Sequence, residues 1–503
     1  MRRRTKAIAP LVALALVAAA CGGDDDDSGS ESTAEGTAES TAEATEETSE
    51  EATEEMSEEA TEEMSEEATE EMSEDDGGEA AAGGEVATDF GVDAENKVIR
   101  VGLNADLSGP FASLVAEIVE SQKVYWEAFN EAGGYQGWTV EPVVIDSGYA
   151  TDVGIQNYEE MAQESEDGVL MITENTGSPI TSAIAPTAAD DNMLVIPLSW
   201  ASLWPDPEFG ATILEKQTTY CNEAINGVEW LKDRVEAEGG EAKLAIIGRP
   251  GEYGEDGSAG AKIAAAELGI EIVYDGTGAV AGDDRTAVIS ELVGSEATIV
   301  WVTLTPGELL DIFGNAVSQG FEATWSGSSP SFNYLVHMPS DFAEQFGQYY
   351  FQSYYQAPWA TPGIPEMERL VAEMTARRPD LNISDVYTTG WIEGIMAETL
   401  IRTAIDQGDM TRANMVAISQ SPDFSVDFGG LSANQSWPQD YDEALVRSSW
   451  IYDIDPSQFN LIPMSEYTPD NPGSTGVIPI EQDYVGTVAA DYEFGGPCIE
   501  PSS

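Results

Sequence analysis

The chain has 503 residues and a formal net charge of −73, because 93 acidic residues stand against only 20 Lys and Arg. So negative a protein repels nucleic acids and anionic membrane surfaces, and we expect neither as a partner. The charge also indicates a salty habitat, where ions screen the self-repulsion. His337 is the single histidine, which argues against a metal centre and against Ser–His catalysis. We expect no cofactor.

The first twenty residues have the pattern of an export signal. A basic start is followed by an apolar run, which is too short to span a bilayer and ends in small residues before Cys21. Residues 1–20 are therefore predicted to be a lipoprotein signal peptide. Cys21 would then carry the lipid that is the chain's only attachment to the membrane. The alternative is an ordinary cleaved signal followed by an incidental cysteine.

Residues 21–96 form an acidic segment of low complexity. The octapeptide Ser-Glu-Glu-Ala-Thr-Glu-Glu-Met occurs there in three tandem copies, the first starting at Ser49. Its like charges repel one another, and it has too little apolar surface to offset the entropy lost on ordering. We expect a disordered tether that lifts the folded part off the membrane, with a fluctuating helix as the alternative.

Beyond the tether, short Val/Ile-rich segments alternate with amphipathic stretches, first before and then after Cys221. This alternation is typical of parallel sheets covered by helices on both faces. One core rarely serves more than about 300 residues, so we predict two α/β lobes, each a doubly wound parallel sheet, joined by a multi-strand hinge. The expected segments are lobe 1 over 97–217, lobe 2 over 218–353, a return to lobe 1 over 354–455, and a C-terminal segment over 456–503 that packs on the lobes.

Two cysteines remain after the predicted lipid anchor. Cys221 and Cys498 are compatible with one disulfide in an exported protein. Their spacing does not show that they meet, and two free thiols are the alternative.

Several segments of the folded part, in this order and spacing, resemble a known family. They are Ile-Arg-Val-Gly-Leu-Asn-Ala-Asp-Leu-Ser-Gly-Pro at 99–110, Asn-Glu-Ala-Gly-Gly at 130–134, Gly-Ser-Pro at 177–179, Leu-Val-Ile-Pro-Leu-Ser at 194–199 and Glu-Tyr-Gly at 252–254. Over residues 97–453 the chain resembles the type I periplasmic binding proteins, in the branch of the Leu/Ile/Val-binding proteins of ABC importers. The resemblance implies a ligand cleft between two hinged lobes.

The resemblance also implies a set of ligand-binding residues. Ser178 would hold a ligand carboxylate at a helix N-terminus, although Ser before Pro179 is also an ordinary helix cap. The loop after the strand 194–198 would meet the carboxylate and amino group, and a tyrosine would close from lobe 2. Trp200 belongs either to the core or to the cleft wall. The predicted ligand-binding residues are Ser178, Ser199, Trp200, Ala201, Ser202, Tyr253 and Ser329.

Ser329 marks a departure from the family pattern. It stands where amino-acid binders place a carboxylate for the ligand's ammonium group, and a buried ammonium without a counter-charge is costly. Asp106 or Glu174 would have to substitute. This departure argues against a zwitterionic aliphatic amino acid and opens the prediction to an amide, a carboxylate or another small polar molecule.

These observations predict a monomeric, lipid-anchored substrate-binding subunit of an ABC importer, which faces the outside of the cell and delivers its ligand to permease subunits. A ligand-sensing surface protein that signals to a partner receptor is the alternative. An enzyme is not expected, because no Gly-x-Ser-x-Gly elbow and no phosphate-binding Gly-Lys-Ser/Thr loop are present. The segment Gly276-Thr-Gly-Ala-Val-Ala281 resembles a dinucleotide loop but does not open a helix directly.

Overall fold

A computed structural model describes residues 86–501, except residues 208, 283 and 439. The predicted signal peptide, Cys21 and most of the predicted tether lie outside the described residues. The folded part begins earlier than residue 97, however. Strand β1 (Ala87–Thr88) pairs with β12 (Asp409–Met410), and β2 (Val92–Asp93) pairs with β3 (Val98–Ala105).

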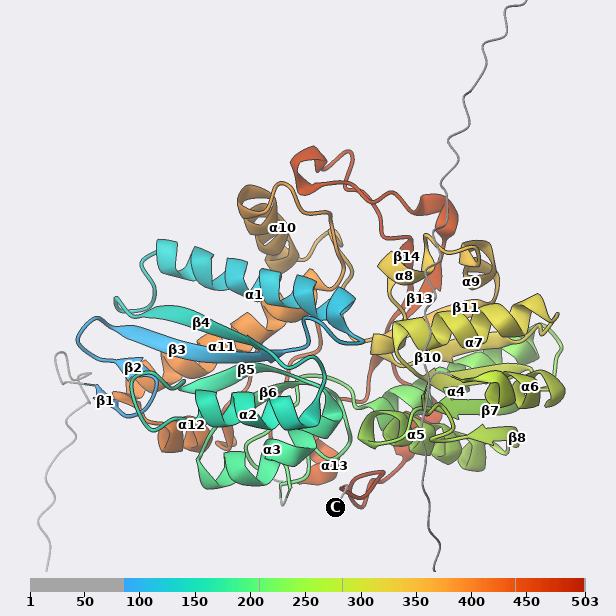
Figure 1. The fold of residues 1–503 in the computed structure, drawn as a ribbon, viewed down its shortest axis with the longest axis horizontal. Helices are drawn as coiled ribbons and strands as arrows, with labels where there is room; N and C mark the ends of the chain where they lie inside the picture. Colours follow the sequence, from blue (N-terminus) through green and yellow to red (C-terminus); the bar gives the residue numbers. More distant parts are fainter. Residues whose placement is uncertain (1–85, 208, 283, 439, 502–503) are drawn as a thin grey trace, which may run out of the picture. The chain divides into compact units, whose positions relative to one another are not determined.

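The first lobe is built on a sheet in which β4, β3, β5 and β6 run parallel in that order, and the short β2 pairs antiparallel with the start of β3. Its further strands are β4 (Thr139–Asp146), β5 (Met171–Thr176) and β6 (Val195–Leu198). The helices of this lobe are α1 (Ala112–Glu131), α2 (Thr151–Met161), α3 (Ser178–Asp190), α10 (Pro365–Arg377), α11 (Tyr387–Gln407) and α12 (Arg412–Ser419). In Figure 1, α1 runs on one side of these strands and α2 and α3 on the other, so the sheet is covered on both faces, and α11 packs against α1.

The second lobe is built on seven strands in the order β14-β13-β11-β10-β9-β7-β8. The strands are β7 (Lys243–Gly248), β8 (Glu271–Gly276), β9 (Ile299–Thr303), β10 (Thr324–Gly327), β11 (Tyr350–Tyr354), β13 (Ser449–Ile454) and β14 (Val477–Tyr484). Five are parallel, whereas β13 and β14 are antiparallel to their neighbours. Its helices are α4 (Tyr220–Ala237), α5 (Glu252–Leu268), α6 (Thr286–Gly294), α7 (Pro306–Ser318), α8 (Tyr334–His337), α9 (Ala343–Tyr349) and α14 (Thr487–Asp491).

The chain passes between the two sheets three times: after β6, after β11 and again before β13. The segment expected to return to lobe 1 over 354–455 therefore does so only up to about β13, which belongs to the sheet of lobe 2. The C-terminal segment does not merely pack on the lobes, because β14 extends that same sheet. The sequence of β14, Val-Ile-Pro-Ile-Glu-Gln-Asp-Tyr, does not alternate between apolar and polar residues. It therefore lacks the pattern that would have predicted a strand.

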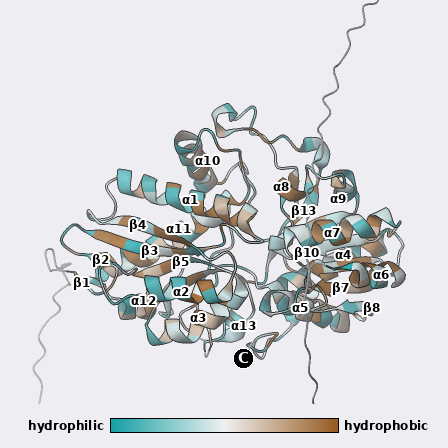
Figure 2. Cartoon of the chain, in the orientation of Figure 1, coloured by the Kyte–Doolittle hydropathy of each residue, from teal (hydrophilic) through white to brown (hydrophobic). Residues whose placement is uncertain are grey.

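Burial explains why these segments form parallel sheets. Every residue of β5, β6 and β9 is buried, as expected for strands covered by helices on both faces. Figure 2 shows brown, apolar strands inside both sheets and teal residues on helices such as α1 and α2. The predicted α/β fold with two hinged lobes is confirmed, with the addition of an antiparallel edge on the second sheet.

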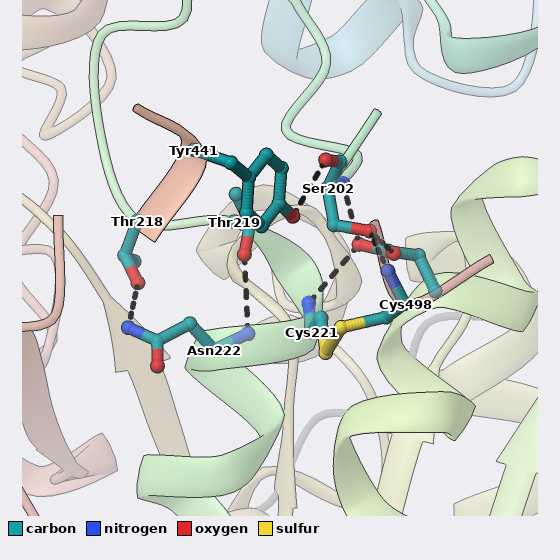
Figure 3. Close-up of a disulfide and its surroundings, with 8 residues drawn as sticks. Ser202, Thr218, Thr219, Cys221, Asn222, Tyr441 and Cys498 are labelled. Atoms are coloured by element: carbon teal, nitrogen blue, oxygen red, sulfur yellow. Dashed lines mark hydrogen bonds between the residues drawn. A yellow bond between two sulfur atoms is a disulfide. The ribbon is translucent and has the colours of Figure 1, made fainter. Parts of the chain in front are cut away.

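Cys221 and Cys498 form a disulfide, so the open prediction of a pair is confirmed. The bond ties the C-terminal segment to the first turn of α4, beside Ser202 and Tyr441 (Figure 3). Within the described part of the chain, no helix is long and apolar enough to cross a bilayer. The same residues contain no group of three His, Cys, Asp or Glu that is arranged to hold a metal ion.

Candidate functional site

A pocket lies where the carboxyl ends of β5 and β6 meet elements of lobe 2, and its cavity volume is about 40 Å³. Doubly wound sheets place their ligands at such strand ends. Lobe 1 contributes the start of α1, the turn from β5 into α3, and the residues after β6. Lobe 2 contributes α5 and the turn after β10. The lining residues are Phe111, Leu114, Val115, Ile118, Tyr149, Thr176, Gly177, Ser178, Leu198, Trp200, Tyr220, Tyr253, Ser329, Pro330, Tyr354, Tyr355, Val386 and Thr389.

Ser178 lies in this lining at the first turn of α3, as the sequence predicted. The cap position itself is held by Gly177, whose φ of 107° suits glycine, and the Ser178 side chain makes no capping hydrogen bond. The capping role considered for Ser178 is therefore wrong. Its hydroxyl instead lies 2.7 Å from the hydroxyl of Ser199. Ser178 thus lies at the N-terminus of α3, and its side chain does not cap the helix.

The residues after β6 have two roles: one lines the cavity, and another holds the lining in place. Trp200 lines the cavity and is nearly buried, with its ring against Tyr220 and Tyr355. Ser199 is outside the lining, where its hydroxyl accepts a hydrogen bond from the indole N–H of Trp204. Trp200 therefore serves as cleft wall and core at once, whereas Ser199 reaches the cavity only through Ser178.

Ala201 and Ser202 are buried and also lie outside the lining. The Ser202 backbone N–H donates to a carboxylate oxygen of Asp256 on α5 at 3.0 Å, and its hydroxyl donates to the other oxygen. The backbone N–H of Cys498 donates to the same hydroxyl at 2.8 Å. Ser202 thus joins lobe 1 to lobe 2 beside the disulfide (Figure 3). Direct ligand contact by Ser199, Ala201 and Ser202 stays a prediction.

Two predicted residues come to the cavity from lobe 2. The Tyr253 hydroxyl donates to the Leu304 carbonyl at 2.8 Å, and this bond fixes the ring in the wall. Ser329 follows β10, and both its backbone N–H and its hydroxyl donate to the carboxylate of Glu223 on α4. Burial raises the pKa of Glu223 well above the usual range for glutamate.

A buried ion pair lies behind Trp200, and sequence reasoning missed it. Lys216 Nζ lies 3.0 Å from Glu393 Oε1 with both side chains fully buried, and it also lies over the Trp200 ring at 5.6 Å from the centroid. Nearby, burial and the charge of Glu393 raise the pKa of Glu174 to about 8. The two acids considered as ammonium ligands, Asp106 and Glu174, are both outside the lining.

The sequence also gave little warning of the cavity's apolar walls. Phe111 directly follows the first segment of the family resemblance, and Tyr354 and Tyr355 stand where the chain leaves lobe 2. The positions of these three residues next to predicted site segments were a weak indication of a role in the cavity. No sequence pattern near any of them showed that they line the same cavity. The described lining contains no charged side chain. A largely apolar pocket with a few hydroxyls is suited to holding a small molecule rather than to transforming one.

The fold and the cavity together define a two-lobed solute-binding protein. A family model described as periplasmic binding protein matches residues 98–458, and the chain belongs to this family. The family is one of binding proteins, which confirms the prediction that the chain is not an enzyme. The resemblance to the Leu/Ile/Val-binding branch is confirmed as well.

The individual proteins to which the chain is similar share a quarter or less of its residues in the matched regions. The chain is 25% identical over 207 residues to "Leu/Ile/Val-binding protein homolog 3" of Brucella melitensis, a match that covers 40% of this chain and about half (53%) of that protein. A fatty acid ABC transporter substrate-binding protein from Thermomonospora curvata superposes with a TM-score of 0.68 at 24% identity, over 81% of this chain and 97% of that one. A branched-chain amino acid ABC transporter protein from Thermus thermophilus with bound valine gives 0.62 at 17% identity, over 79% and 100%.

Proposed function

We propose that this chain is the lipid-anchored substrate-binding subunit of an ABC importer, which captures a small solute outside the cell and presents it to permease subunits. The cavity lined by both lobes is the observation that carries the proposal. Because the lining residues come from lobe 1 and lobe 2 alike, a ligand there contacts both and favours the closed form. Membership of the periplasmic binding proteins and the ABC substrate-binding relatives support the same function.

The relatives do not agree on a ligand. One is named for fatty acids, one holds valine and one is named for Leu, Ile and Val. The function therefore needs a test that does not presuppose the solute. The melting temperature of the purified chain should rise with one class of compound in a panel of amino acids, amides, carboxylates, polyols and sugars. A ligand at 100 times its Kd adds about 2.7 kcal/mol of stability.

The site itself is tested with variants. Ser178→Ala and Tyr253→Ala should weaken binding of the best compound. Ser182→Ala should not, since Ser182 is buried on the same helix α3 but lies outside the lining. A compound that binds equally well to the wild type and to both lining variants would place the site elsewhere and contradict the proposal.

The membrane anchor is tested separately, because Cys21 lies outside the described residues. In a bacterial host, wild-type chain should sediment with membranes and incorporate a labelled fatty acid, and Cys21→Ser should do neither. A Cys21→Ser chain that is still found in the membrane fraction would remove the lipid anchor from the proposal.

A further inference from the structure

The walls of the cavity are almost entirely hydrocarbon and aryl. Twelve of the lining residues have aliphatic or aromatic side chains, five of them tyrosines, and Ser, Thr, Gly and Pro make up the rest. Phe111 packs edge-on to Tyr253 across the lobes with ring centroids 6.0 Å apart. A solute without an apolar body would lose its hydration in this cavity and gain little binding free energy from the apolar walls.

Most hydroxyls in the lining already have partners. Thr176 donates to Glu174 at 2.6 Å, and Ser329 donates to Glu223 at 3.3 Å. The Thr389 hydroxyl lies 3.2 Å from the Gln356 side-chain oxygen, to which it donates. The protons of these hydroxyls are therefore used within the protein and are not available to an anionic ligand.

Ser178 is different, because its neighbours leave its proton available. The indole N–H of Trp204 can only donate, and it donates to Ser199 at 3.2 Å. Either hydroxyl can be the donor in the 2.7 Å contact of Ser199 with Ser178, and when Ser199 donates, the Ser178 O–H is free to donate to a ligand. The first turn of α3 adds the positive end of a thirteen-residue helix at the same place. One corner of an apolar cavity is thus arranged for a single anionic group.

Within the described residues, the cavity has no corresponding site for a positively charged ligand group. The Asp106 carboxylate accepts hydrogen bonds from the backbone N–H groups of Gly109 and Phe111, and Glu223 is occupied by Ser329. Glu174 keeps one buried oxygen without a partner, yet it stands outside the lining and beside Glu393. An ammonium group in the cavity would be buried without a counter-charge.

From this arrangement we infer that the ligand is a monocarboxylate with an aliphatic or aromatic body and no ammonium group. The carboxylate lies at Ser178 and the first turn of α3, and the body fills the space between Phe111, Trp200 and Tyr355. This inference rests on the proposed function and narrows it. The chain is therefore a carrier of hydrophobic organic acids rather than of amino acids.

Isothermal titration with compounds that share one carbon skeleton tests the inference on the wild-type protein. 4-Methylpentanoate is leucine without its ammonium group, and 4-methylpentanamide is the same skeleton without the charge. 3-Phenylpropanoate and phenylalanine form a second pair. Each carboxylate should bind at least about 100-fold more tightly than its amino acid, because an unpaired ammonium is costly to bury. The amide should bind more weakly than its carboxylate.

Ser178→Ala should weaken 4-methylpentanoate by roughly 10- to 100-fold, the effect of one hydrogen bond to a charged group, and should leave the amide nearly unaffected. Ser182→Ala is the matched control. If leucine binds as tightly as 4-methylpentanoate, and Glu174→Gln abolishes leucine binding, the ligand class is wrong while the importer function stands. Binding of the amide equal to that of the acid would overturn the anionic corner. A protein that binds only polyols or sugars would overturn the ligand class alone, and a folded protein that binds nothing in either panel would contradict both proposals.

Discussion

Asp256 should make the stability of this protein fall as the pH rises. Its side chain is fully buried on α5, where its two oxygens accept hydrogen bonds from Ser202 and from the backbone N–H of Cys221 at 3.1 Å. These donors lower its pKa, but burial outweighs them and raises the pKa from 3.8 to about 7. The folded protein therefore holds the Asp256 proton over a range of pH in which the unfolded chain releases it.

The direction and magnitude of this pH dependence follow from the difference in proton binding between the folded and the unfolded chain. Below pH 4 both states are protonated and the contribution of Asp256 to stability is fully present. Between about pH 4 and pH 7 the unfolded chain binds fewer protons, so the free energy of unfolding falls, and above pH 7 the loss is complete. A shift of about three pKa units at 1.36 kcal/mol each corresponds to a loss of up to about 4 kcal/mol.

Asp256→Asn isolates this contribution. The amide oxygen can accept from both backbone N–H groups, while its NH₂ donates to the Ser202 hydroxyl, so the contacts between the lobes are kept. Urea unfolding of both proteins should be followed from pH 4.5 to 8.5 in molar NaCl, which screens the repulsion of the net charge. Relative to wild type, the variant should gain about 3 kcal/mol across this range. Glu160→Gln, an exposed change on α2, is the control. Equal losses in wild type and Asp256→Asn would refute the reasoning.

Three further outcomes are expected. Thermal melting in dilute buffer should occur at a lower temperature than in molar salt, because the net charge of −73 repels itself most where screening is weak, and equal melting temperatures would contradict this. Replacing Cys221 and Cys498 together by serine should cost about 3–5 kcal/mol in chemical denaturation, since the disulfide closes a loop of 277 residues, and a loss below about 1 kcal/mol would speak against it. Gly260→Ala should lower the melting temperature, because its Cβ would lie 1.9 Å from the carbonyl oxygen of Cys221, whereas Gly307→Ala meets open space and should leave the melting temperature nearly unchanged.

The fold was predictable because its signals are local. Strands such as β6 and β9 are buried on both faces, so they read as nearly unbroken apolar runs, and the helices between the strands show one apolar stripe. The edge of lobe 2 was not predictable in the same way. Strand β14 is partly exposed and pairs only with β13, so its residues follow no pattern that distinguishes them from a loop. The sheet to which a returning segment adds is decided by tertiary packing.

The site divides along the same line. Ser178 and Tyr253 stand on segments of the family resemblance, Trp200 directly follows one, and Ser329 marks a departure from the family pattern; the structure brings all four to one cavity. The apolar wall is made by residues that are far apart in sequence, and no local pattern joins them. The buried pair of Lys216 and Glu393 is equally invisible, because each residue alone looks like an ordinary surface charge on a very acidic chain.

Ser329 shows most clearly what position-by-position comparison misses. The sequence records only that an acid is absent there, which left open whether another acid serves the same ligand group. In the structure a carboxylate does lie behind Ser329, but it belongs to Glu223, 106 residues earlier, and it accepts the backbone N–H and the hydroxyl of Ser329 itself. The serine thus stands between the acid and the cavity and donates both its backbone N–H and its hydroxyl to it. The change at this position therefore removes an ammonium site and also covers the nearest replacement, which is why the apolar walls and the hydroxyl of Ser178 decide the ligand.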